Sequence, residues 1–524
     1  MFEGSGVRVE ALASGGRKVL RRRGRQILLI AAGEQVFAVA ARCPHEGYPL
    51  SEGTLSEGGP CLLTCDWHNW KFDLATGAAV VGRDPVRTFP VEVRQGEIFL
   101  DLADPPPDQR ARRALAGLEA AMDDDDPARM AREVARLERA GVDARGALVH
   151  AIGHTSGRLE GGMTHAHAAA ADWLALRERA PDPDQRLAAV VEPIAHLAWD
   201  TLGAGPFPFP EAILAWDPDA FLSAMEAEDE ARAIGRLRGA LAEGLAYADL
   251  RPILSEAALA HYADFGHSAI YVLKAGQLIE RLDGAAAEPI LIALTRQLIY
   301  ARREDRLPAF RGYGAALARW SAGGGKAVTV QGLVGQPVNR VLERLCAARG
   351  RPAPETYDAL MGAAAWNMLH FDARLEQAAS SNVADAVGWL DFTHALTFAN
   401  ATRRLCDERP DLGGAALLQL GLFVGRNRAY VDAGQDVSAW EIADPKAFLR
   451  REMARLYDHG LPEPIIACHR LKVLFALEDE LAAAPDAPWA GVMCAAVNRY
   501  LNTPMKRRHS LRLARQARAF AARE

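Results

Sequence analysis

Short hydrophobic runs alternate with polar turns over the first hundred positions of the chain. Four runs, at 7–9, 26–30, 36–39 and 97–100, contain mainly Val, Ile, Leu and Phe and lie between glycine-containing segments. Runs of this length and composition are typical of β-strands. The pattern therefore predicts a small all-β domain over residues 1–103.

The pattern changes after the segment Asp104-Pro105-Pro106-Pro107-Asp108. Consecutive prolines cannot continue a strand or enter a helix interior, so we expect a stiff linker at 104–112. From 113 to 524 the chain is rich in Ala, Leu, Arg and Glu at helical spacing. The predicted fold class is multidomain, a small all-β domain followed by a large all-α domain, with a candidate division into two subdomains near 321–337.

A weak repeat runs through the helical part. The segments 163–166, 265–268 and 392–395 share the pattern large apolar, small, histidine, small. A second apolar stretch begins 22 to 24 residues after each histidine, at Leu187, Leu291 and Leu417. Each unit therefore predicts a helical hairpin with a histidine near the start of its first helix.

Composition narrows the class of protein. The 524 residues carry a net charge of −6, which gives no reason to expect a nucleic-acid partner. No apolar run approaches the ~20 residues that a membrane helix needs, and residues 1–16 lack the apolar core of a secretory signal. Seven cysteines in so long a chain do not form a disulfide framework. We expect a cytoplasmic protein without a membrane partner.

Two short motifs near the amino terminus carry the clearest chemistry. Cys43-Pro44-His45 and Cys65-Asp66-Trp67-His68 supply two thiolates and two imidazoles, 19 residues apart. This is the ligand set of a Rieske 2Fe-2S cluster, so we expect Cys43 and Cys65 to hold one iron and His45 and His68 the other. A zinc site with the same ligands is the alternative, but zinc fingers do not interleave their cysteines and histidines in this way.

The surrounding segments, 42–53 and 65–73, resemble the Rieske domains of ring-hydroxylating oxygenases and their ferredoxins. The separation of the half-motifs is slightly long for that family, and Asn69 stands where a glycine is usual. Tyr48 occupies the place of a cysteine found in respiratory Rieske domains. The resemblance implies a low-potential cluster that takes single electrons from a separate flavin- or ferredoxin-type reductase.

The usual catalytic partner of such a domain is not apparent. The iron of that catalytic partner is held by a motif that resembles Asp/Glu-x-x-His-x-x-x-x-His. Asp264 and His267 supply its first half, but Val272 stands where the second histidine would be. Asp391 and His394 also match only the first half, because Ala399 stands where the second histidine would be. The strands of that partner fold are missing too, so we do not expect a ring-hydroxylating oxygenase α subunit.

The helical part nevertheless has an excess of histidines at positions that share a helix face with a carboxylate or another histidine. Residues three or four apart on a helix are neighbours, and di-iron and mononuclear non-haem iron sites use such residues. A single histidine of this kind is more often a core or capping residue. As a set they predict either a metal site, with mono- or dinuclear iron, or a substrate pocket, and the candidate residues are His267, His394, His165, His150, His154, Asp264, Asp391, His196 and Glu192.

The helical part is also similar to the questin oxidase-like family, through the segment 389–397 and the motifs at His165 and His267. That resemblance implies oxidation of polyketide-type aromatic compounds. We predict an oxidoreductase in which the cluster passes electrons to a histidine-lined site where O₂ and a small organic substrate react, as in a monooxygenase. The alternatives are an electron carrier or redox sensor with a helical docking module, and a metal-free oxidase.

Overall fold

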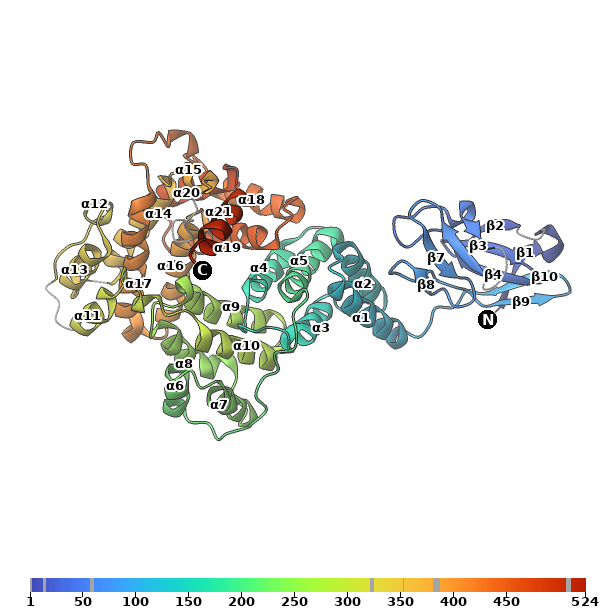
Figure 1. Ribbon diagram of the computed structural model, residues 1–524, viewed down its shortest axis with the longest axis horizontal. Coiled ribbons are helices and arrows are strands. Elements are labelled where there is room, and N and C mark those ends of the chain that lie inside the picture. The colour runs from blue at the N-terminus through green and yellow to red at the C-terminus, as the bar shows by residue number, and fades with distance from the viewer. Residues whose placement is uncertain are drawn as a thin grey trace. The chain divides into compact units, whose positions relative to one another are not determined.

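The computed structural model describes residues 2–12, 16–56, 61–320, 325–351, 353–379, 387–505 and 510–524. The chain divides by its internal contacts into two units, residues 1–117 and 118–524. We call the strands and loops of the first the β unit and the second the helical body (Figure 1). A small β domain followed by a largely helical region confirms the predicted fold class.

The boundaries 1–103, 104–112 and 113–524 remain predictions, and the structure adds that a helix begins at Pro107. The predicted break near 321–337 begins at residues 321–324, which lie outside the described residues.

Three antiparallel sheets build the β unit, in the orders β1-β10-β9, β2-β3-β4 and β5-β6-β7-β8. The strands are β1 Phe2–Arg8, β2 Arg17–Arg22, β3 Arg25–Ala32, β4 Gln35–Ala40, β5 Thr54–Leu55, β6 Leu62–Cys65, β7 Trp70–Asp73, β8 Ala79–Val81, β9 Val91–Arg94 and β10 Glu97–Asp101.

Strand β3 is apolar on both faces because it separates two cores. Successive side chains of a strand point to opposite faces. Ile27 and Leu29 pack in one core with residues of β1 and β10. Leu28 and Ile30 pack in the other, together with Cys43 and with residues around β6 and β7. This second core supports the two loops that carry the cysteine–histidine motifs.

The helical body and the segment that leads into it contain the α-helices. They are α1 Pro107–Asp123, α2 Pro127–Arg139, α3 Arg145–Ser156, α4 His165–Arg179, α5 Pro183–Thr201, α6 Pro218–Glu226, α7 Glu230–Ala242, α8 Tyr247–Leu259, α9 His267–Arg281, α10 Ala287–Tyr300, α11 Gly312–Arg319, α12 Val330–Leu333, α13 Val338–Ala348, α14 Ala353–Leu369, α15 Arg374–Gln377, α16 Leu390–Cys406, α17 Gly413–Asn427, α18 Pro445–Arg455, α19 Pro464–Ala483, α20 Ala490–Asn502 and α21 Ser510–Ala521.

The predicted hairpins are present, and there are four of them in the described part of the chain with a histidine in the first helix. In each, the first helix packs against the second, as α4/α5, α9/α10, α16/α17 and α19/α20. The second helix begins 18 to 21 residues after that histidine in all four. The repeat read from the sequence therefore has a fourth member.

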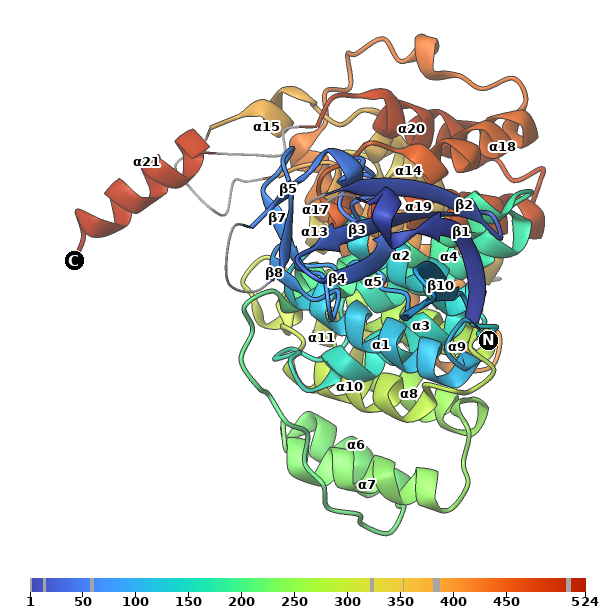
Figure 2. The ribbon, with the colours of Figure 1, turned by 90° about the vertical axis from the view of Figure 1, so that its right-hand side faces the viewer.

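The first helices of the four hairpins form the centre of the helical body. Helix α4 packs against α9 and α19, and α16 packs against the same two helices, which closes a ring of four. Helix α4 is buried at every position from Ala166 to Leu176, as expected for a helix surrounded on all sides. Helices α6 and α7 lie side by side at the edge of the helical body in both views (Figures 1 and 2).

Among the described residues, no helix combines the length and the apolar character needed to cross a bilayer.

Candidate metal centres

Two loops of the β unit bring the first motif together. Cys43 follows strand β4, and Cys65 is the last residue of β6. Both cysteines are buried in the second core, 3% and 1% exposed. His45 and His68 come from the same two loops, and their Nδ1 atoms lie 3.2 Å apart. The two loops thus carry a neighbouring pair of cysteines and a neighbouring pair of histidines.

Tight turns hold these loops. The Gly47 amide donates to the Cys43 carbonyl at 2.9 Å, and the Asn69 amide donates to the Cys65 carbonyl at 2.9 Å. Gly47 and Asn69 have φ values of +74° and +60°. Asparagine is one of the few residues other than glycine that adopt this left-handed conformation readily. The departure from the usual glycine at Asn69 is therefore compatible with the turn.

The donor set fits a cluster with one cysteine-bound and one histidine-bound iron. Burial is the main cause of the raised pKa of the Cys43 thiol, which is about 11. A bound cation is therefore required to hold this side chain as a thiolate. The His45 ring stacks on Trp70 and the His68 ring on Trp67, at centroid distances of 4.6 and 5.3 Å. Trp67 is 58% exposed, so the histidine side of this site faces solvent.

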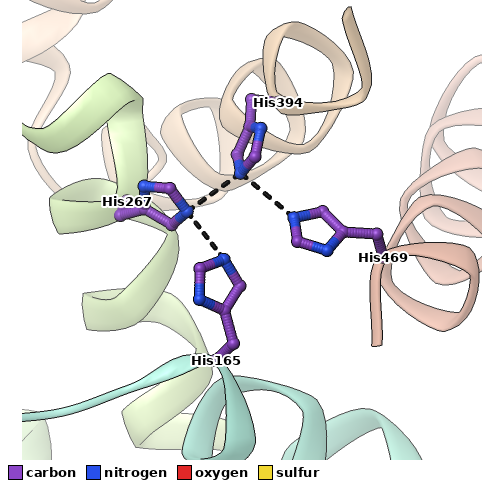
Figure 3. Close-up of side chains that lie close together, drawn as sticks. All are labelled: His165, His267, His394 and His469. Carbon is purple, nitrogen blue, oxygen red and sulfur yellow. Dashed lines mark hydrogen bonds between the residues drawn. The ribbon is translucent and has the colours of Figure 1, made fainter. Parts of the chain in front are cut away.

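A second group lies at the centre of the helical body. His165 of α4, His267 of α9, His394 of α16 and His469 of α19 point toward one another (Figure 3), and we call them the tetrahistidine group. The Nε2 atom of His267 is 2.8 Å from that of His165 and 2.9 Å from that of His394. The Nε2 atoms of His394 and His469 are 3.2 Å apart. One nitrogen from each ring lies within 4.8 Å of the other three.

Main-chain carbonyl groups fix the tautomer of three of these rings. The Nδ1 atoms of His267, His394 and His469 contact the carbonyl oxygens of Asp264, Leu390 and Ile465. A carbonyl oxygen accepts but cannot donate, so each Nδ1 carries the proton and each Nε2 of a neutral ring is a bare lone pair. The contacts of His394 with His267 and His469 therefore contain no hydrogen, and a shared cation is needed to make them favourable.

Protons are poor candidates for that cation. Burial lowers the pKa of His267 to about 3, and the nearby charge of Lys472 lowers it further. Burial is also the main cause that lowers the pKa of His165, His394 and His469 well below the ordinary value. Four neutral imidazoles, each held at its other nitrogen, form the arrangement in which proteins present histidine to a metal ion.

The paired carboxylates predicted from the sequence lie next to this group but do not enter it. The Asp264 carboxylate is 3.8 Å from the Nδ1 side of His267 and bonds to Gln297 and Arg302. The Asp391 carboxylate accepts from the Gly388 amide and pairs with Arg426 at 2.8 Å. Within the described residues the group contains four histidines and no carboxylate.

The remaining candidate ligands lie elsewhere. His150 pairs with Glu119 at 2.8 Å and His154 with Asp123 at 3.3 Å. His196 is buried 3.7 Å from Asp200. Glu192 contacts His459 at 3.2 Å. Of the nine candidates, the structure brings together only His165, His267 and His394.

His469 was absent from the sequence-based candidates. It follows Ala467-Cys468 and precedes Arg470, so it lacks both the large apolar residue and the small residue of the repeat motif. It also lies deeper in its helix, at the sixth residue of α19. The signal that could have found it is the spacing, because α20 begins 21 residues after His469, close to the 18 to 20 residues of the other three hairpins.

Comparison with known proteins concerns the β unit. Residues 7–90 match the Rieske [2Fe-2S] domain family. The 3-phenylpropionate/cinnamic acid dioxygenase ferredoxin subunit of Escherichia coli K12 is 36% identical over 83 residues, which are 16% of this chain and 76% of that subunit. The 4beta-methylsterol monooxygenase of Methylococcus capsulatus is 42% identical over 86 residues. The matched part is 14% of this chain and 22% of that enzyme, so the match spans less than a quarter of the enzyme's length.

A solved structure also matches. The ferredoxin of carbazole 1,9a-dioxygenase from Nocardioides aromaticivorans IC177 is 24% identical and covers 19% of this chain and 96% of its own. Its TM-score is 0.18, too low to carry an argument. The family match ends at residue 90 and does not reach the helical body. Through its amino-terminal β unit, with Cys43, His45, Cys65 and His68 in the loops described above, the chain belongs to the Rieske [2Fe-2S] family.

Proposed function

We propose that the protein is an oxidoreductase in which electrons pass from a Rieske cluster in the β unit to a single metal ion held by the tetrahistidine group. The observation that carries this is the pair of Nε2 contacts of His394, at 2.9 and 3.2 Å, between rings whose tautomers leave no proton to share. Four donor atoms this close suit one ion better than two. We therefore favour a mononuclear site over a dinuclear one.

The four cluster ligands would have two different roles. Cys43 and Cys65 hold the buried side of the cluster, and His45 and His68 hold its exposed side. With the cluster bound, the β unit supplies single electrons, for which the solvent-facing imidazoles are the natural route in and out. A separate cytoplasmic reductase of the flavin or ferredoxin type would provide these electrons.

The helical body would supply a shielded reaction site. Imidazole ligands suit iron, copper and zinc. We infer iron because a cluster that donates single electrons requires a redox-active ion as its acceptor. Such an ion supports oxidation of a small organic molecule by O₂, as in a monooxygenase. The buried position of His267, His394 and His469 limits access of water to the site.

The metal content of the purified full-length protein tests this proposal. We expect more than the two iron atoms of the cluster, with one further metal ion per chain. His394→Ala should lose that ion while the visible and electron paramagnetic resonance spectra of the cluster persist, since the two sites share no residue. The matched control is His150→Ala, because His150 pairs with Glu119 outside the tetrahistidine group. Two metal atoms per chain in the wild-type protein, both iron, would contradict the proposal.

A second function is favoured by a different observation, the match to a dioxygenase ferredoxin subunit over three quarters of that subunit's length. The protein would then be an electron carrier or redox sensor whose helical body docks a partner. In that case His394→Ala would leave electron transfer from a reductase to an acceptor protein unchanged. Under the favoured proposal, the same substitution abolishes substrate-dependent oxygen uptake.

A further inference from the structure

A cavity of about 210 Å³ lies in the helical body. Helices α6, α8 and α10 contact one another in pairs and form its walls, and residues of the segment 261–268 complete the lining. The lining contains neither a cluster ligand nor a member of the tetrahistidine group. The cavity is therefore separate from both candidate metal centres.

Small and apolar side chains leave this space open. Ala257 of α8, Ala260 just after that helix and Ala301 just after α10 lie in its walls, with Met225 and Leu298 beside them. Protein interiors contain few voids larger than a water molecule. An apolar cavity of about 150 Å³ is large enough to bind benzene. The volume here therefore suits a molecule with a single six-membered ring.

The charged side chains around the cavity are already paired. Glu226 contacts His261 at 2.8 Å and Arg303 at 3.0 Å. Glu256 contacts Arg409 at 3.0 Å. Every charged group in the described lining thus has an opposite charge beside it, and a charged ligand would find no free counter-ion there. The lining favours an uncharged ligand.

One polar side chain of the lining is unpartnered. Ser268 is 2% exposed, and its Oγ atom has no hydrogen-bond partner among the described residues. Buried polar groups are ordinarily hydrogen-bonded, and a serine hydroxyl can both donate and accept. A hydroxyl group on a ligand would provide the missing partner.

The cavity adjoins the turn that carries His267. Ala263 precedes this turn, Ser268 follows His267, and both residues line the cavity. A ligand in the cavity would therefore lie against residues on both sides of the turn.

We propose that this cavity binds an uncharged monocyclic compound that carries a hydroxyl group. The ring packs against the apolar walls from α6, α8 and α10, and the hydroxyl group bonds to Ser268. Pockets for small molecules ordinarily combine apolar walls with a few placed polar groups in this way. Neither a bound metal ion nor the cluster is required for this binding.

Fluorine NMR titration of the full-length protein with 4-fluorophenol and with fluorobenzene tests the proposal. The two probes share a ring and differ by one hydroxyl group, and phenols are uncharged at neutral pH because they titrate near pH ~10. We expect both to bind, and 4-fluorophenol to bind about 2- to 10-fold more tightly, the value of one hydrogen bond. Ser268→Ala should remove this difference.

A second substitution fills the cavity itself. Ala257→Leu should weaken the binding of both probes by at least about tenfold, because the added side chain overlaps the ring. Ala248→Leu, at an exposed position of the same helix outside the cavity, is the matched control and should leave both affinities unchanged. Filling a cavity commonly stabilises a protein, so we expect the variant to fold. Ala257→Met is the alternative, should the first variant fail to express.

Two results would overturn the inference. If neither probe binds to the wild type, or if both variants at Ala257 bind the probes as tightly as the wild type, the cavity is not the site. If the two probes bind with equal affinity, the ligand is not held through a hydroxyl group. Metal analysis separates this test from the proposed function, because Ala257→Leu should retain the metal content of the wild type whatever that content is.

Discussion

At the scale of single residues, the main chain decides which nitrogen of each imidazole is available. The carbonyl oxygens that contact Nδ1 of His394 and His469 belong to the same helix as the histidine, and the one that contacts Nδ1 of His267 belongs to the turn before α9, so local main chain orients each ring. No carboxylate is needed for this orientation. Asp264 and Asp391, which the sequence pairs with two of the histidines, instead anchor the starts of their helices.

Buried neutral histidines also make stability depend on pH. Burial lowers the pKa of His196 to about 3 and that of His167 to about 4. In the unfolded chain both titrate near 6.5. Below that pH the unfolded state binds more protons, so folding stability is complete above about pH 6.5 and is lost progressively toward pH 3.

We therefore expect the free energy of unfolding to fall between pH 8 and pH 5 by on the order of 2 kcal/mol for each of these two residues. Urea denaturation of metal-free protein, followed by far-ultraviolet circular dichroism, measures this. His196→Gln should reduce the pH dependence. Equal stability at pH 8 and pH 5 would show that these histidines are not buried in the neutral form.

At the scale of elements, the turn before α9 sets the position of His267. Asp264, Phe265 and Gly266 all have positive φ, which is costly for the first two. The Phe265 amide donates to Glu304 at 3.1 Å, and its ring lies 4.8 Å from the Arg426 guanidinium carbon, so neighbouring side chains hold the turn. A Cβ atom added at Gly266 would meet the Phe398 ring at 2.8 Å.

Substitution of this glycine tests the role of the turn. Gly266→Ala should lower the free energy of unfolding by about 2–4 kcal/mol, the sum of backbone strain and overpacking, and should reduce occupancy of the tetrahistidine group. Gly284→Ala is the matched control, since Gly284 also has positive φ (+78°) but no atom within 4 Å of the added Cβ. It should cost about 1 kcal/mol and retain the metal. Thermal denaturation and metal analysis compare the two, and equal effects would contradict the packing argument.

At the scale of the whole molecule, the two candidate centres lie in separate units. The cluster residues belong to loops of the β unit, and the tetrahistidine residues belong to four helices that pack on one another. No residue takes part in both sites. Loss of one centre should therefore leave the other structurally intact while electron transfer between them stops.

Removing a cluster ligand checks this independence. Cys65→Ser in the full-length protein should abolish the cluster absorbance and remove two iron atoms, while helical circular dichroism and the third metal ion persist. Reductase-driven oxygen uptake should disappear. Cys61→Ser, at the unpaired cysteine four residues earlier, should retain all three metal atoms. If Cys65→Ser also loses the third metal ion, the two sites are not independent.

Local signals in the sequence were sufficient for the fold class, the Rieske motif and three of the four hairpins. Strand and helix periods are properties of neighbouring residues, and the spacing Cys-x-His and Cys-x-x-His carries the cluster chemistry within two loops. The tetrahistidine group is different, because histidines that contact each other in this group lie 75 to 127 positions apart in the sequence.

Only the packing of α4, α9, α16 and α19 around one axis decided which histidines meet, and it added His469 while excluding His150, His154 and His196. The same packing excluded the carboxylates, because Asp264 and Asp391 lie at the helix starts, where neighbouring arginines pair with them. A one-dimensional pattern places a residue on a helix face, but the neighbour of that face is determined by long-range packing.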